Sequence, residues 1–171
     1  MLDQFKHITH FVFDVDGVLT DGNLLILPDG LMARRMNIKD GYALQLAVKK
    51  GYRITIISGG NSPEVKDRLN KLGITEVYMQ VADKLSLLQS LMTKHQSNAN
   101  CFLFMGDDIP DLKCMQIVGL PTCPSDAVNE IKECATYISA LKGGEGCVRD
   151  VIEKVLKLRE DWNDDFQIRA Q

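Results

Sequence analysis

The stretch of sequence that decides the fold is Phe11-Val12-Phe13-Asp14-Val15-Asp16-Gly17-Val18-Leu19-Thr20-Asp21-Gly22. Residues 8–13 are rich in aromatic and β-branched side chains, and this composition predicts a buried strand. Two carboxylates, Asp14 and Asp16, follow that strand directly. Because an unpartnered carboxylate in a protein interior costs several kcal/mol, acids at this place imply a compensating cation or hydrogen bonds. The pattern is typical of a metal-assisted active site, and it also fits an acidic turn that ends a strand.

The length and composition of the chain fit one ordinary globular domain. A chain of 171 residues suffices for a core that buries roughly 70% of the surface exposed by the unfolded chain. The net charge is -3, and no cluster of Lys and Arg is long enough to follow a phosphate backbone. We therefore expect small-molecule chemistry, with neither nucleic acid nor an anionic membrane as the main partner.

The five cysteines indicate a reducing environment. They form no Cys-x-x-Cys pair, so a zinc site or a redox motif has little support. We interpret them as free thiols of a cytoplasmic protein. No apolar run approaches the ~20 residues that span a bilayer, so we expect neither export nor membrane insertion.

Strand-like and helix-like segments alternate along the chain. The expected strands are short runs rich in apolar residues at 8–13, 53–57, 76–79, 101–104, 119–123 and 136–139. Helices are expected between them, such as the one that Pro63 opens and Gly73 closes. This alternation implies right-handed βαβ units. The sequence therefore predicts an α/β fold, a three-layer Rossmann-like parallel sheet with helices on both faces.

A predicted β-hairpin at residues 23–38 interrupts this alternation. Its extended runs, 23–27 and 31–38, are joined by Pro28-Asp29-Gly30, in which Pro presets φ and Gly accepts a positive φ. We expect Asp40 to cap the helix that follows. In this interpretation residues 1–162 form a single domain, and residues 163–171 form a polar C-terminal tail.

Polar side chains follow three of the predicted strands at their carboxyl ends, where ligands bind in folds of this kind. They are Asp14, Asp16, Ser58, Asp107, Asp108 and Asp111. Lys84, near the start of a helix, could supply the positive charge that an acidic, phosphate-handling cleft needs. Taken singly, Ser58 would pass for a turn residue and Lys84 for a solvated lysine.

In combination, these motifs resemble the haloacid dehalogenase superfamily of phosphotransferases. The four signatures of that superfamily occur in order as Asp14-Val15-Asp16-Gly17-Val18-Leu19-Thr20, Ser58, Lys84 and Gly106-Asp107-Asp108-Ile109-Pro110-Asp111. Other segments resemble the capless branch that includes the 3-deoxy-D-manno-octulosonate 8-phosphate phosphatases, in which a small hairpin stands in place of a cap domain. These segments are Asp21-Gly22, Asn37-Ile38-Lys39-Asp40-Gly41-Tyr42, Asp83-Lys84-Leu85 and Gly143-Gly144-Glu145-Gly146-Cys147-Val148-Arg149-Asp150.

The resemblance implies a Mg²⁺-dependent phosphomonoester hydrolase of lipopolysaccharide sugar biosynthesis. Asp14 would be the nucleophile that forms an aspartyl-phosphate, and Asp16 would be the general acid and then the general base. The implied Mg²⁺ ligands are the carboxylates of Asp14 and Asp107 and the backbone carbonyl of Asp16, with Asp108 and Asp111 in an outer shell. The implied phosphate and substrate contacts are Ser58, Gly59, Lys84, Arg34, Lys39 and Arg149.

The identity of the substrate is less specific in the sequence. The expected substrate is 3-deoxy-D-manno-octulosonate 8-phosphate, and the alternative is a nine-carbon ulosonate 9-phosphate, from KDN or N-acetylneuraminate. Related octulosonate phosphatases tend to have Thr-Gly-Arg where this chain has Ser58-Gly59-Gly60, so an arginine expected near the sugar acid is absent.

Two other classes of protein share parts of this pattern. One is a non-catalytic regulatory module, like the phosphatase-like domain attached to animal CMP-sialate synthetases, but here Asp14, Asp16, Lys84 and Asp107 are all present. The other is a phospho-acceptor response regulator, whose acidic pair lies in a different motif.

The predicted hairpin also favours self-association. It carries apolar residues that are unsuited to a solvent-facing flap: Leu24, Ile26, Leu31 and Met36. We therefore expect a homo-oligomer, specifically a homotetramer.

Overall fold

A six-stranded parallel sheet forms the centre of the protein, for which the computed structural model describes residues 2–168. The strand order is β5-β4-β1-β6-β7-β8, and every neighbouring pair is parallel. The strands are β1 (His10–Phe13), β4 (Arg53–Ile57), β5 (Glu76–Tyr78), β6 (Phe102–Met105), β7 (Leu120–Cys123) and β8 (Tyr137–Ile138). The predicted parallel sheet is thus confirmed.

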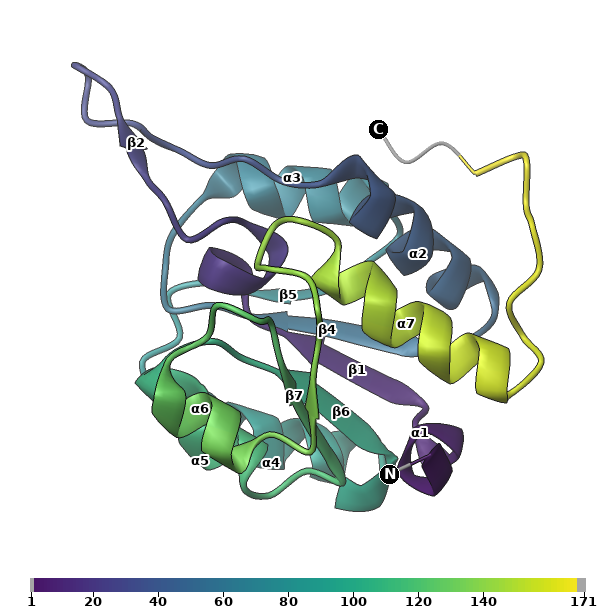
Figure 1. The fold of residues 1–171 in the computed structure, drawn as a ribbon. Coiled ribbons are helices and arrows are strands. Elements are labelled where there is room, and N and C mark those ends of the chain that lie inside the picture. The colour runs from purple at the N-terminus through teal and green to yellow at the C-terminus, as the bar shows by residue number, and fades with distance from the viewer. Residues whose placement is uncertain (1, 169–171) are drawn as a thin grey trace.

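Helices cover both faces of this sheet, as Figure 1 shows. On one face lie α1 (Leu2–His7), α2 (Ile38–Lys49), α3 (Pro63–Lys71) and α7 (Cys147–Leu158). On the other face lie α4 (Lys84–Lys94), α5 (Leu112–Met115) and α6 (Asn129–Cys134). Because side chains alternate along a strand, Phe11 and Phe13 of β1 pack into the first layer and Val12 packs into the second. The predicted three-layer architecture is confirmed.

The helix caps explain where several elements begin. Ser62 accepts a hydrogen bond from the backbone N–H of Val65 at the start of α3, and Asp83 does the same for Ser86 in α4. At α2 the cap is Asn37, whose Oδ1 accepts from the N–H of Lys39, so the expectation that Asp40 caps this helix is wrong. Asp40 is buried and instead accepts a bond from the N–H of Arg149, in the first turn of α7.

The hairpin lies outside the main sheet. Its strands, β2 (Leu25–Ile26) and β3 (Met32–Ala33), are antiparallel and much shorter than the extended runs in the sequence. Figure 1 shows it projecting from the body of the protein. A single bridge between Thr20 and Met36 closes its base.

The segment after α7 runs back toward α2. The backbone N–H of Asp165 donates to the hydroxyl of Tyr42, and the Asp165 carboxylate pairs with Lys49 at 3.0 Å. The last three residues of the predicted polar tail, 169–171, lie outside the described residues. None of the helices within residues 2–168 has both the length and the apolar character needed to cross a bilayer.

Candidate active site

One pocket, of about 300 Å³, gathers the motif residues at the carboxyl ends of β1, β4 and β6. Eight predicted site residues line it: Asp14, Asp16, Ser58, Gly59, Lys84, Asp107, Asp108 and Asp111. Three further residues complete the lining: Gly22, Gly60 and Pro110. Because parallel strands end at the same edge of a sheet, segments almost a hundred residues apart in sequence meet here.

The loop after β1 has a fixed conformation. Gly17 has a φ of 87°, and a Cβ at this position would overlap the Asp107 carboxylate, so only glycine fits. The buried hydroxyl of Thr20 accepts bonds from the N–H groups of Gly17 and Gly22 and donates to the carbonyl of Val15, each at 3.3 Å. These bonds hold the loop that carries Asp14 and Asp16.

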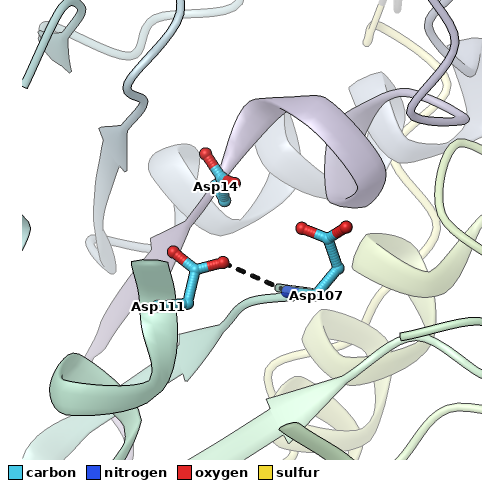
Figure 2. A group of neighbouring side chains, drawn as sticks. All are labelled: Asp14, Asp107 and Asp111. Carbon is cyan, nitrogen blue, oxygen red and sulfur yellow. Dashed lines mark hydrogen bonds between the residues drawn. The ribbon is translucent and has the colours of Figure 1, made fainter. Parts of the chain in front are cut away.

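A lysine joins two of the buried carboxylates. Lys84 Nζ lies 2.7 Å from Asp111 Oδ1 and 3.1 Å from Asp14 Oδ1. Asp14 Oδ1 also accepts a bond from the N–H of Val15 at 2.7 Å. Asp111 Oδ2 accepts from the N–H of Asp107 at 3.1 Å, the dashed line in Figure 2. The orientations of the Asp14 and Asp111 carboxylates are therefore fixed by the protein.

The cluster carries more negative charge than Lys84 balances. Burial, followed by the charge of Asp111, raises the pKa of Asp14 to about 7. Burial, followed by the charges of Asp14 and Asp111, raises the pKa of Asp107 to about 7. Both shifts disfavour the ionised form, so a bound cation would stabilise the ionised carboxylates of Asp14 and Asp107.

The donor set fits a hard divalent cation. Asp14, Asp107 and Asp111 each offer a carboxylate oxygen, and these oxygens lie within 4.8 Å of one another (Figure 2). Oxygen ligands of this kind are those that Mg²⁺ prefers. Both oxygens of Asp111 already accept bonds, from Lys84 and from the backbone of Asp107, so Asp14 and Asp107 are the better candidates for direct contact.

Asp16 has a partner that the sequence did not indicate. Arg34 Nε donates to Asp16 Oδ1 at 2.7 Å, and Arg34 Nη2 donates to Asp16 Oδ2 at 3.2 Å. The predicted substrate contact Arg34 thus binds a catalytic candidate of its own chain.

Lys39 and Arg149 are not brought to this pocket. They line a different one, between the start of α2 and the exposed side of α7. The guanidinium of Arg149 lies over the rings of Tyr42 and Trp162, at 5.5 and 5.4 Å from their centroids, and Arg149 Nε pairs with Glu153 at 3.1 Å. Within one chain, Arg149 therefore ties α7 to α2 and to the segment that follows α7.

The glycine-rich turn before α7 supports the loop that carries Asp14 and Asp16, a role that the sequence analysis missed. A Cβ on Gly143 would overlap the carbonyl oxygen of Gly17, and the N–H of Gly144 donates to the carbonyl of Val18 at 3.0 Å. The run of glycines was the available signal, because close approach of two backbones requires residues without side chains.

The residues at this sheet edge define a phosphatase of the haloacid dehalogenase superfamily. They comprise a nucleophile candidate, an acid two residues later, a serine, a lysine and an acidic pair. No family model matches the chain, but individual relatives do. The 3-deoxy-D-manno-octulosonate 8-phosphate phosphatase of Yersinia pestis is 31% identical over 156 residues, which cover 91% of this chain and 83% of that protein. A structure from Legionella pneumophila, described as a hydrolase of this superfamily and of its subfamily III A, is 35% identical with a TM-score of 0.90, over 93% of this chain and 87% of that one.

The chain belongs to the 3-deoxy-D-manno-octulosonate 8-phosphate phosphatase-like family, in the capless subfamily III A of that superfamily. A structure of the Moraxella catarrhalis phosphatase is similar to it at 32% identity and a TM-score of 0.90, over 94% of this chain and 92% of that one. That structure is a complex with a magnesium ion, a phosphate ion and a KDO molecule.

Proposed function

We propose that this phosphatase hydrolyses 3-deoxy-D-manno-octulosonate 8-phosphate to the free sugar acid and phosphate, as a step of lipopolysaccharide sugar biosynthesis in the cytoplasm. The observation that carries the proposal is the cluster of Asp14, Lys84 and Asp107 in a chain similar to proteins of that name. Asp14 and Lys84 are buried, and Asp107 is partly buried. The five free cysteines fit a reducing compartment.

Asp14 is positioned to act as the nucleophile. Its two contacts, from Lys84 and from the N–H of Val15, are both on Oδ1, which orients the carboxylate so that Oδ2 attacks phosphorus. The new bond joins Asp14 to phosphorus, and the bond from phosphorus to the sugar oxygen breaks. Lys84 and the Ser58 hydroxyl hold the phosphoryl oxygens in this proposal.

Asp16 provides proton transfer in both halves of the reaction. It gives its proton to the departing sugar oxygen, which leaves as an alcohol. It then takes a proton from the water that attacks the aspartyl-phosphate, and the bond between Asp14 and phosphorus breaks to release phosphate. A phosphoryl transfer to Asp14 and a hydrolysis of the aspartyl-phosphate thereby replace one difficult step.

We also propose that the carboxylates of Asp14 and Asp107 and the backbone carbonyl of Asp16 hold a Mg²⁺ ion, with Asp108 and Asp111 outside the inner set. When bound, the ion screens the negative charges of the nucleophile and the phosphate from one another. The raised pKa values of Asp14 and Asp107 support this assignment, since both groups lack a compensating charge of sufficient size.

The carboxylate end of the substrate needs a second cation, separate from Lys84. Lys39 and Arg149 lie at another pocket of the same chain, so we propose them as contacts to the substrate of a neighbouring subunit. This requires the homotetramer that we propose for the active form.

Comparing two substrates tests the proposed function. We expect a higher kcat/KM for the eight-carbon 8-phosphate than for nine-carbon ulosonate 9-phosphates, measured by release of inorganic phosphate. A preference of tenfold or more for a nine-carbon compound, about 1.4 kcal/mol of transition-state discrimination, would establish the alternative substrate.

Two controls show whether the chain is an enzyme of this kind at all. Asp14→Asn should abolish turnover without loss of folding, because the amide has nearly the same shape and is a poor nucleophile. Excess chelator should also stop the reaction, and Mg²⁺ should restore it. Turnover in either control would contradict the mechanism, and a fully inactive wild type would favour the regulatory-module alternative.

A further inference from the structure

Arg34 has a buried side chain on a largely exposed hairpin. Its side chain is only 4% exposed, whereas the side chain of the next residue, Arg35, is 80% exposed and pairs with Asp21. Met32, two residues earlier, is 49% exposed. Burial of a guanidinium is costly unless it is well bonded, so the contacts of Arg34 show what it is placed to do.

Those contacts fix the guanidinium at three points. Two of its N–H groups form the bidentate pair with Asp16, and Arg34 Nη1 donates to the carbonyl of Met32 at 3.1 Å. A two-point contact between guanidinium and carboxylate sets the plane of the carboxylate as well as its place. Each carboxylate oxygen has two lone pairs, so Arg34 leaves one lone pair on each oxygen of Asp16 for proton transfer.

Gly60 leaves the space that this pair occupies. A Cβ at Gly60 would lie 2.9 Å from Asp16 Oδ2 and 3.1 Å from Arg34 Nη2, closer than ordinary van der Waals contact. The N–H of Gly60 donates to the Ser58 hydroxyl at 3.2 Å, so the same turn also orients a phosphate-binding candidate.

We propose that Arg34 is a positioning residue for Asp16: it holds the carboxylate of the general acid–base at the angle that the reaction needs, and it links that angle to the hairpin. The inference rests on the proposed function of Asp16. It replaces the predicted role of Arg34 as a direct substrate contact, since Arg34 acts here through a side chain of the protein.

A double-mutant cycle with Asp16→Asn tests this role. Alone, Arg34→Met should lower kcat by about 10- to 100-fold, the loss that misplacement of a catalytic group causes, with little change in KM. In the Asp16→Asn background the same change should alter kcat by less than about threefold, because the group that Arg34 positions is no longer functional. Arg34→Lys should fall between wild type and Arg34→Met, since it retains the charge without the bidentate contact.

Arg35→Met is the matched control on the same hairpin. It removes an equal charge from an exposed position and should leave kcat within about twofold of wild type. The thermal unfolding temperature of each variant shows whether a loss of kcat reflects a misplaced Asp16 or an unfolded protein. An Arg34→Met protein that is folded and equally impaired in both backgrounds, or that is impaired mainly in KM, would contradict the inference.

This outcome is distinct from a failure of the proposed function. Turnover by Asp14→Asn, or an undiminished kcat in Asp16→Asn, would remove the proposed mechanism itself. If both of these variants are impaired and the effect of Arg34→Met is additive with Asp16→Asn, only the role of Arg34 is overturned.

Discussion

At the scale of single residues, His10 makes the stability of the protein depend on pH. It lies at the start of β1, at the end of the strand away from the candidate active site. Its side chain is buried and stacks on Phe102, with ring centroids 4.5 Å apart, and its Nε2 has no hydrogen-bond partner among the described residues. Burial, followed by the charges of His95 and Arg53, lowers the pKa of His10 to about 4. The folded protein therefore binds fewer protons here than the unfolded chain between about pH 4 and pH 6.5.

Because this pKa is depressed on folding, the associated stability is present above pH 6.5 and is lost as the pH falls toward 4. We expect His10→Phe to remove this dependence, so that its free energy of unfolding falls by about 2 kcal/mol less than that of wild type between pH 7 and pH 5. Urea unfolding at the two pH values measures the difference. His7→Gln, at an exposed position, is the control, and equal pH dependence in wild type and His10→Phe would contradict the prediction.

The sequence predicted which strand-end residues meet at the candidate site better than it predicted which loop residues reach that site. Asp14, Ser58 and Asp107 were predictable because each follows a strand whose apolar composition is visible, and parallel strands end together. The pair of Arg34 and Asp16 was not, since an irregular hairpin connects them and no periodicity fixes its path. Arg149 was predicted near the substrate from resemblance alone.

At the scale of elements, the glycine-rich turn before α7 supports the loop that carries Asp14 and Asp16. We expect Gly143→Ala to destabilise the protein by about 1–3 kcal/mol, because the added methyl group overlaps the backbone of Gly17 and one of the two segments must move. It should also lower kcat, since a displacement of about 1 Å at Asp14 or Asp16 can cost about 100-fold.

Gly30→Ala is the comparison variant for this prediction. Gly30 has a φ of 81° in the hairpin turn, and a Cβ there would contact nothing, so this change introduces backbone strain alone. Chemical denaturation and steady-state kinetics should show a loss of stability in both variants and a loss of kcat in Gly143→Ala. A Gly143→Ala protein with wild-type kcat would show that the turn does not position the loop.

The order and type of the main-sheet strands and of most helices were predictable from the sequence. Each of these elements buries one or both faces, so its apolar residues recur with the period of a strand or a helix. Three elements were not predictable in this way. Helix α1 was missed, since it has only six residues and buries a single side chain, Phe5. Strands β2 and β3 were predicted too long, because their residues are exposed and no packing holds an extended conformation.

At the scale of the whole molecule, residues 1–162 as one domain with a polar tail stays a prediction. The described part of the tail is attached to the body: Trp162 packs against the core, and Asp165 bonds to Tyr42 and Lys49. These contacts predict that residues 163–168 become ordered together with α2, although the segment was predicted only as a polar tail.

The hairpin projects from the body of the protein (Figure 1), and its surface is apolar. Its exposed side chains are Leu24, Leu25, Ile26, Leu31 and Met32, and together with α3 the hairpin lines a hollow of about 460 Å³. A two-stranded hairpin is marginally stable alone, and contiguous apolar surface of this kind marks a protein–protein interface. The phosphoryl transfer that we propose at Asp14 would also gain from exclusion of bulk water, which a hairpin packed on a neighbouring subunit would provide.

We therefore expect a homotetramer at micromolar concentration by sedimentation equilibrium. Ile26 is the best position for a mutational test, because at 69% it is the most exposed apolar residue of the hairpin. Burying an isoleucine contributes about 1.5–3 kcal/mol, and a tetramer repeats the contact in each subunit, so Ile26→Glu should dissociate it and lower kcat/KM. Gln89→Glu, which adds the same charge at an exposed position of α4, should leave assembly unchanged. A wild type that sediments as a fully active monomer would contradict the homotetramer, and the subunit contacts proposed for Lys39 and Arg149 could not form.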